Sequence, residues 1–314
     1  MKNLIDLFLH SFSSIMPVFA IFLTGFAFGK IFKKPSEMLS KLAFWLFGTV
    51  LVFTYVTEHV PKLEHLWKYF LGTIIVTLCI IFFYWILGKI RGKSYTLWAY
   101  TNIFSNTGYI GYPVLEYSIG PHAIPLAVIM ASTNMVLLPT VGMSLLSSER
   151  NGMLKNALKN MLKVPWLYAF VISWIIGAMG FNWREDLPLP AFNFVEMLSQ
   201  SAIPVILLVV GINLSKIPLK LSSLKQIMPA SLMKLFLPPA IALVVGKLIG
   251  MEGLVYQVFV LEIAMPTAAN TAIMAEGISE AKKRENELEF SSAVVVYSTF
   301  LFLFTYPIWF SIMS

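Results

Sequence analysis

The chain is poor in charge. Only 12% of its 314 residues are Asp, Glu, Lys or Arg, whereas 58% are hydrophobic. A soluble domain needs roughly 25% charged residues to cover its surface, so lipid must be the solvent for much of this molecule. The longest polar stretch, residues 147–163, is too short to fold alone. The composition therefore predicts an integral membrane protein without a separate soluble domain.

Cysteine, aspartate and histidine are also scarce. The single cysteine, Cys79, lies in an apolar run and excludes an intrachain disulfide. The two aspartates, Asp6 and Asp186, lie far apart in sequence, and no histidine falls deep within an apolar run. These residues give neither paired carboxylates, nor a Ser–His pairing, nor metal-ligand spacing. We expect no enzyme activity and no histidine metal site.

Apolar runs of about 20 residues, enough to cross ~30 Å of hydrocarbon, recur along the whole chain. They cover residues 13–32, 39–57, 69–90, 97–119, 123–146, 165–181, 194–214, 227–249, 254–279 and 290–312. The sequence therefore predicts an all-α fold of ten transmembrane helices. The fourth and ninth contain Gly and Pro at 106–113 and 265–271, and both helices should be interrupted there.

The basic residues sort to one side of these spans. Of the 23 Lys and Arg residues, 17 fall on one side and five on the other, and Lys234 lies within a span. The positive-inside rule places the 17 in the cytoplasm and both termini outside the cell membrane. The net charge of +7 is thereby explained by membrane orientation, and we expect no nucleic-acid partner.

The two halves of the chain repeat. The matched pairs, in order, are Pro17 and Gly29 with Pro165 and Gly177, Glu37-Met38-Leu39-Ser40 with Glu196-Met197-Leu198-Ser199, Gly88-Lys89-x-x-Gly92 with Gly246-Lys247-x-x-Gly250, Asn106-Thr107 with Asn270-Thr271, and Ala127-Val128 with Ala293-Val294. We predict a first five-helix repeat at 1–146, a cytoplasmic linker loop at 147–164 and a second repeat at 165–314. Since five is odd, the second copy is inverted, as in many secondary transporters.

The two predicted interruptions are the candidate binding site. A helix break in a membrane survives only where protein or a water-filled cavity receives its backbone groups. Half-helix N-termini suit an anion, and freed carbonyls suit a cation. The alternative is a Gly/Pro kink whose polar residues bond their own backbone. The candidate substrate-binding residues are Asn106, Thr107, Gly108, Tyr109, Gly111, Pro113, Asn134, Lys234, Pro266, Thr267, Asn270 and Thr271.

Two charged residues lie inside predicted spans. An ionisable group costs roughly 2.5–3.5 kcal/mol at mid-membrane, so Glu262 is a functional candidate. It could bind Na⁺ or carry a proton, or it could be a structural partner of a hydroxyl or of Lys234. Lys234 itself could snorkel to the cytoplasmic surface or present its charge to an anionic substrate.

The residues around the two interruptions resemble those of a known family. The run Asn106-Thr107-Gly108-Tyr109-Ile110-Gly111-Tyr112-Pro113-Val114-Leu115, followed by Gly120, resembles the helix-4 signature of the auxin efflux carrier family. Ala264-x-Pro266-x-Ala268-x-Asn270 resembles its helix-9 counterpart, and the short linker resembles the bacterial members. The resemblance implies a scaffold domain and a crossover domain, a homodimer, and elevator-like movement of organic anions.

A more distant similarity is to the bile-acid sodium symporters. Ser105-Asn106 and Glu262-Ile263-Ala264-Met265 are similar to the symporters' sodium-site runs, although Pro266 stands where the symporters have a Gln ligand. This similarity implies ion coupling through Ser105, Asn106, Glu262 and Met265, with Na⁺ at the first three. Proton coupling through Glu262 is the alternative.

The expected function is secondary transport of a small organic anion, a mono- or dicarboxylate such as malate or malonate. An auxin-like hydrophobic weak acid is the nearest rival, and it predicts an aromatic cavity from Phe104, Tyr109 and Tyr112. A passive channel or a membrane sensor is the alternative from another class. We expect no cofactor other than Na⁺.

Overall fold

The computed structural model describes residues 2–32, 37–137, 141–142, 145, 165–217, 224–269, 271 and 281–314. Within these ranges the protein is helical, and its β-structure is limited to one isolated bridge. The predicted linker loop, 147–164, and the predicted site residue Asn270 lie outside the described residues.

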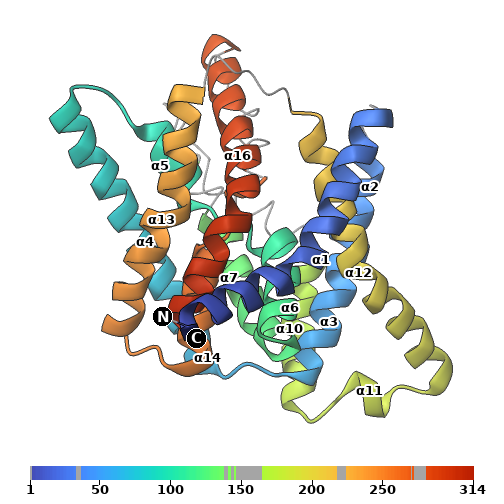
Figure 1. Ribbon diagram of the computed structural model, residues 1–314. Helices are drawn as coiled ribbons and strands as arrows, with labels where there is room; N and C mark the ends of the chain where they lie inside the picture. Colours follow the sequence, from blue (N-terminus) through green and yellow to red (C-terminus); the bar gives the residue numbers. More distant parts are fainter. Residues whose placement is uncertain are drawn as a thin grey trace.

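The helices follow the apolar runs of the sequence (Figure 1). In chain order they are α1 (Lys2–Phe32), α2 (Glu37–Lys41), η1 (Leu42–Phe47), α3 (Gly48–Glu58), α4 (Leu63–Arg91), α5 (Thr96–Ile103), η2 (Thr107–Gly111), α6 (Tyr112–Ser118), η3 (Pro121–Ala123), α7 (Ile124–Leu137), α10 (Pro165–Ala178), α11 (Trp183–Asp186), α12 (Leu189–Ser215), α13 (Leu224–Leu248), α14 (Gly253–Ile263) and α16 (Ala281–Met313).

Six helical stretches in the described ranges are long and apolar enough to cross a membrane, so the protein is a multi-pass membrane protein. They are Ile15–Phe32, Met38–Glu58, Glu64–Arg91, Leu189–Ser215, Leu224–Leu248 and Glu287–Met313. The predicted spans 97–119 and 254–279 are not among them because both are interrupted. The first is divided into α5, η2 and α6, and the second ends its first helix, α14, at Ile263. The first predicted interruption is therefore present, and at the second the chain leaves the helix after Ile263 and is non-helical over the described residues 264–269.

Several pairs of helices pack side by side. Helix α1 lies along α12 and α3 along α10, while α13 lies along α16 and α4 along α7. Figure 1 shows α1, α3 and α12 on one side of the molecule and α4, α5 and α13 on the other. Glycines allow the α1–α12 contact, because a Cβ on Gly25 would clash with the backbone of Leu208 and one on Gly211 would clash with Phe22. Such small residues let membrane helices approach closely.

Helices α4 and α13, which the sequence predicts to be equivalent in the two repeats, end in the same way. Helix α4 is followed by Gly92 at φ 63°, and α13 is followed by Gly250 at φ 70°. Only glycine adopts this left-handed conformation readily. In each turn an N–H reaches back to the matching glycine carbonyl, from Lys93 to Gly88 at 3.2 Å and from Met251 to Gly246 at 2.9 Å.

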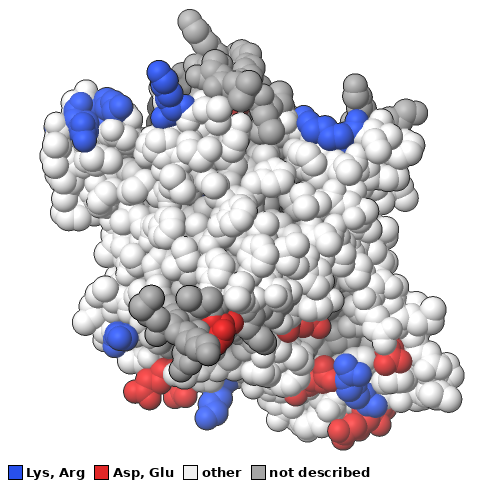
Figure 2. Space-filling view, viewed as in Figure 1, with Lys and Arg blue, Asp and Glu red and all other residues white. Residues whose placement is uncertain are grey.

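Charge separates between the two ends of the molecule. In Figure 2 one end carries Lys and Arg, and the acidic residues in view gather at the opposite end together with a few basic ones. The basic end includes the last turns of α1, with Lys30, and of α4, with Lys89 and Arg91.

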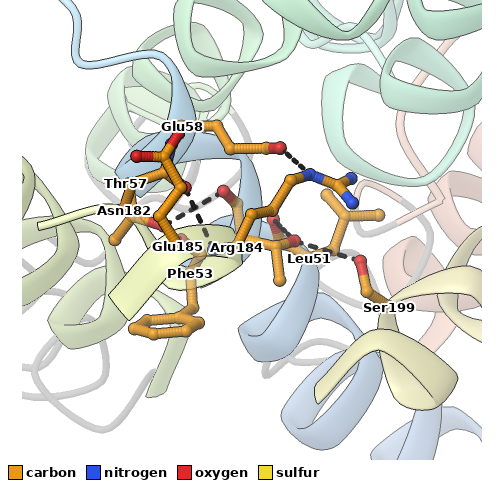
Figure 3. Close-up of polar contacts among 9 residues, drawn as sticks. Leu51, Phe53, Thr57, Glu58, Asn182, Arg184, Glu185 and Ser199 are labelled. Carbon is orange, nitrogen blue, oxygen red and sulfur yellow. Dashed lines mark hydrogen bonds and ion pairs between the residues drawn. The ribbon is translucent and has the colours of Figure 1, made fainter. Parts of the chain in front are cut away.

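Polar contacts at the acidic end connect α11 to α3 (Figure 3). The Asn182 side chain accepts the Arg184 N–H at 3.0 Å and so begins α11. The Arg184 guanidinium pairs with the Glu58 carboxylate in the last turn of α3. Because the Arg184 side chain is half-exposed, at 51%, this pair contributes at most about 1 kcal/mol.

Candidate functional site

The two interrupted helices meet at their breaks and bond to each other. The Asn106 N–H donates to the Pro266 carbonyl at 2.7 Å, and the Ala268 N–H donates to the Phe104 carbonyl at 2.9 Å. These bonds flank an antiparallel bridge between Ser105 and Thr267. An unpaired backbone group would cost several kcal/mol in hydrocarbon. Each break therefore supplies backbone partners that the other lacks, and the crossing is a specific structure rather than two separate kinks.

Lys234 reaches this crossing from α13. Its side chain is fully buried, so it does not snorkel to the surface. The Nζ atom donates to Ser105 Oγ at 2.6 Å and to the Ile263 carbonyl at 3.2 Å. The Ser105 hydroxyl in turn donates to the same carbonyl at 2.9 Å. One ammonium thus holds the break of the fourth span against the end of α14.

A pair of prolines follows Lys234 in α13 and frees backbone carbonyls for contacts with another helix. Pro238 and Pro239 lack N–H groups, so the carbonyls four residues earlier lose their helical partners. The freed carbonyl of Leu235 accepts the Trp309 indole N–H at 2.8 Å. The proline pair therefore ties α13 to α16 directly beside Lys234.

Glu262 is the second buried ionisable residue at the crossing. It is fully buried in the last turn of α14, and neither carboxylate oxygen has a hydrogen-bond partner within the described ranges. Its carboxylate lies against Gly111, where an added Cβ would fall 2.5 Å from Glu262 Oε1. Among the ion pairs of the described residues, none joins Glu262 to Lys234. The alternative that Glu262 serves as the ion-pair partner of Lys234 is therefore not observed.

Asn106 carries an unused donor. The residue is 3% exposed, and its Nδ2 has no acceptor in the part of the chain that the structure describes. Its backbone is fully engaged, because the carbonyl accepts the Gly111 N–H at 3.0 Å while the N–H is bonded across the crossing. A buried amide without a partner costs about 1–3 kcal/mol, so a ligand acceptor at this point would recover that energy.

A small cavity of ≈ 40 Å³ adjoins the half-helix that starts at the first break. On the break side it is lined by Gly108, Tyr109 and Tyr112, and on the other side by residues of η1, α3 and α12. Space around Gly108 is open, since a Cβ built there would meet nothing within 4 Å. The free N–H groups of a helix start belong to its first four residues, so this end of the half-helix borders the cavity. Phe104 does not line it and packs against Tyr100 instead.

The hydroxyls predicted for the second break serve the backbone. The Thr267 hydroxyl donates to the Thr101 carbonyl at 3.0 Å, and the Thr271 hydroxyl donates to Ala268 within its own turn at 2.7 Å. For Thr271 the structure shows the arrangement expected of a simple kink. The remaining predicted residues are Thr107, buried at the start of η2, Pro113 in the first turn of α6, Asn134 in α7 and Met265, which is fully buried.

Three residues at the crossing were not predicted as site residues. Ser298 accepts the Thr267 N–H at 3.1 Å, and the Tyr100 hydroxyl donates to the Thr271 carbonyl at 2.7 Å. Asn102 is fully buried and lies 2.5 Å from the Tyr84 hydroxyl. Asn102 was detectable, because a polar amide four residues before Asn106 in an apolar run needs a partner. The other two are ordinary helix residues whose roles depend on tertiary packing.

The chain is similar to known membrane transport proteins. A family model described as "Membrane transport protein" matches residues 10–310. An uncharacterized transporter of Methanocaldococcus jannaschii is 24% identical over 273 residues, covering 83% of this chain and 87% of that protein. A Rhizobium meliloti protein named "Putative malonate transporter" is 23% identical over 300 residues, covering 91% of each chain.

Proposed function

Because the chain belongs to the membrane transport protein family, the auxin efflux carrier family that its sequence resembles, we propose that it is a secondary transporter of small organic anions. The observation that carries the proposal is the buried, unpartnered amide donor of Asn106 at the start of a half-helix. The Lys234 ammonium donates a hydrogen bond to the hydroxyl of Ser105, the residue before Asn106.

These groups together favour a carboxylate. The half-helix that begins at Thr107 borders the cavity with Gly108 and Tyr109, so its positive dipole end lies beside the cavity. The Thr107 N–H itself donates to the Ser105 carbonyl at 2.9 Å. Asn106 Nδ2 is buried two residues before Gly108 and does not line the cavity, so in our proposal it becomes a side-chain donor when the helices separate. A protonated Lys234 would raise the local positive potential without touching the substrate. A carboxylate placed here would receive both hydrogen bonds and charge, while a neutral solute would use only the hydrogen bonds.

A dicarboxylate is the first substrate class we propose. The relative named for malonate supports it. The cavity of ≈ 40 Å³ is too small for such a molecule. Binding therefore requires η1, α3 and α12 on one side of the cavity to separate from the broken helix on the other. A hydrophobic weak acid is the second candidate, because Tyr109 and Tyr112 give the cavity aromatic walls.

Two pairs of helix contacts support an inverted repeat, and for the movement we propose the elevator mechanism that the family resemblance implies. Exchanging the two halves of the predicted fold turns the α1–α12 contact into the α3–α10 contact, and turns α4–α7 into α13–α16. In our proposal, ten spans form a scaffold from α1, α3, α10 and α12 and a moving group that carries the crossing. Positive-inside placement puts the basic end in the cytoplasm and both termini outside the cell membrane. A homodimer remains the assembly that the family resemblance implies.

Between the two coupling ions, the geometry favours a proton. A Na⁺ ion on Ser105 Oγ would lie about 4 Å from Lys234 Nζ, where two like charges repel by about 4 kcal/mol at an effective dielectric constant of 20. Glu262 provides a proton site instead, because its carboxyl group is buried beside Gly111 with no partner among the described residues. We therefore propose proton coupling through Glu262, and sodium coupling through Ser105, Asn106 and Glu262 becomes the rival.

Thermal stabilisation of the purified protein tests the proposal. A ligand that binds only the folded state raises the melting temperature by mass action. Malonate and malate should raise it in choline buffer as much as in Na⁺ buffer, whereas a neutral amide of malonate should not. A larger shift with an indole acid would favour the hydrophobic candidate. A shift that requires Na⁺ would restore the sodium site, and no shift with either acid class would remove the anion assignment.

A further inference from the structure

A second cavity, of ≈ 290 Å³, lies at the basic end of the molecule between the end of α4 and the start of α5. Two lysines line it, Lys89 in the last turn of α4 and Lys93 in the following turn. None of the described residues that line it is acidic. A ligand in this cavity would therefore meet an uncompensated positive charge of two.

Aromatic rings hold both lysines in place. Lys89 Nζ lies 5.7 Å from the centroid of the Trp85 ring, and Lys93 Nζ lies 5.1 Å from that of Tyr95. Such cation–π contacts reduce the freedom of the two side chains. The left-handed Gly92 reverses the chain between them, so that one turn presents both ammonium groups to the same cavity.

Hydroxyl groups complete the polar part of the cavity. Ser94 Oγ and Thr96 Oγ1 are 2.9 Å apart, and the Thr96 N–H donates to Ser94 Oγ at 3.3 Å. Two ammonium groups and two hydroxyls match the donors that recognise a phosphate ester.

The rest of the cavity is apolar and open to lipid. Ile81 and Ala99 line it. Trp85 is 58% exposed and stacks on Phe82, which is 60% exposed, on the outer face of α4. On a membrane protein such a face contacts acyl chains. Charged groups at the end of a lipid-facing apolar wall fit a phospholipid better than a soluble phosphate.

We infer that this cavity binds the headgroup of an anionic phospholipid of the cytoplasmic leaflet, with the phosphate on Lys89 and Lys93 and an acyl chain along Trp85. The inference does not depend on the transported substrate. A lipid here would join α4 to α5, and α5 leads directly into the break at Ser105. Bound lipid should therefore stabilise the helix that positions the crossing.

The experiment compares phospholipids on the full-length protein in detergent. Phosphatidylglycerol should raise the melting temperature of the wild type more than phosphatidylcholine does, and the Lys89→Gln/Lys93→Gln variant should lose at least half of that difference. Lys247→Gln is the matched control, because Lys247 lies in the last turn of α13, at the end of the molecule opposite to the end of α4 (Figure 1). It should keep the full difference.

Three results would overturn the inference. The double variant could keep the full phosphatidylglycerol effect, Lys247→Gln could lose as much of it, or inorganic phosphate could protect as well as the lipid. If the double variant does not fold, the single variant Lys93→Gln is used with native mass spectrometry. It should retain bound phosphatidylglycerol at least threefold less than the wild type, and equal retention would contradict the site.

Discussion

Replacing Lys234 with methionine separates the structural from the functional role of this residue. Methionine has a similar length and fills the same space without charge. Burying an ammonium costs several kcal/mol, and its hydrogen bonds to Ser105 Oγ and the Ile263 carbonyl return about 1.5–3 kcal/mol each. Since these contributions nearly cancel, the free energy of unfolding should change by less than about 2 kcal/mol, and the protein should remain folded.

Anion binding should respond differently. The Lys234 ammonium is bonded to Ser105, the residue before Asn106. In our proposal it lies roughly 8 Å from a bound carboxylate, where a unit charge contributes about 2 kcal/mol at an effective dielectric constant of 20. Its loss should weaken malonate binding by about 30-fold while leaving the melting temperature of the unliganded protein nearly unchanged. The measurement is the malonate concentration that gives half-maximal thermal stabilisation, compared between the wild type and Lys234→Met.

A matched control lies on the same helix. Lys247→Met removes an exposed lysine near the far end of α13, and it should change neither stability nor malonate affinity. Equal malonate affinity in Lys234→Met and the wild type would refute the electrostatic role. A variant that unfolds would show that the ammonium is above all a structural brace between α13, Ser105 and α14.

Three further substitutions probe the crossing. Asn106→Leu removes the unpartnered donor, so it should leave stability unchanged or slightly raised and weaken malonate binding by about 10- to 100-fold, measured by the same titration. Glu262→Gln should abolish the response of uptake to an imposed pH gradient while malonate exchange between the two sides continues, and an unchanged pH response would exclude this carboxyl group as the proton carrier. Gly111→Ala places a Cβ 2.5 Å from Glu262 Oε1, so it should destabilise the protein by about 1–3 kcal/mol and reduce uptake; wild-type melting and uptake would show that the contact is relaxed easily.

Much of the fold could be read from the sequence because its causes are local. Low charge content and repeated apolar runs predict membrane helices whatever their tertiary contacts. The interruptions at 106–113 and 265–271 were predictable because Gly and Pro act on the backbone at their own positions. The matching ends of α4 and α13 follow equally from Gly92 and Gly250.

The site was less predictable because its key contacts connect distant segments. Lys234 and Ser105 are 129 residues apart in sequence, and no local pattern indicates that their side chains meet. Snorkelling is a reasonable expectation for a lysine eight residues into a span, and only the tertiary packing at the crossing, which buries Lys234 fully against Ser105, directs its side chain inward. The hydroxyls of Thr267 and Thr271 show the reverse case, since residues suited to a ligand bond the backbone instead.

Uptake of radiolabelled malonate into proteoliposomes under an imposed proton gradient tests the central claim most directly. We predict saturable accumulation above the external concentration, abolished by a protonophore and strongly reduced by Asn106→Leu. Uptake that stops at the external concentration would indicate a passive channel. No uptake of malonate or malate by a folded protein would contradict the assignment of this crossing as a site for small organic anions.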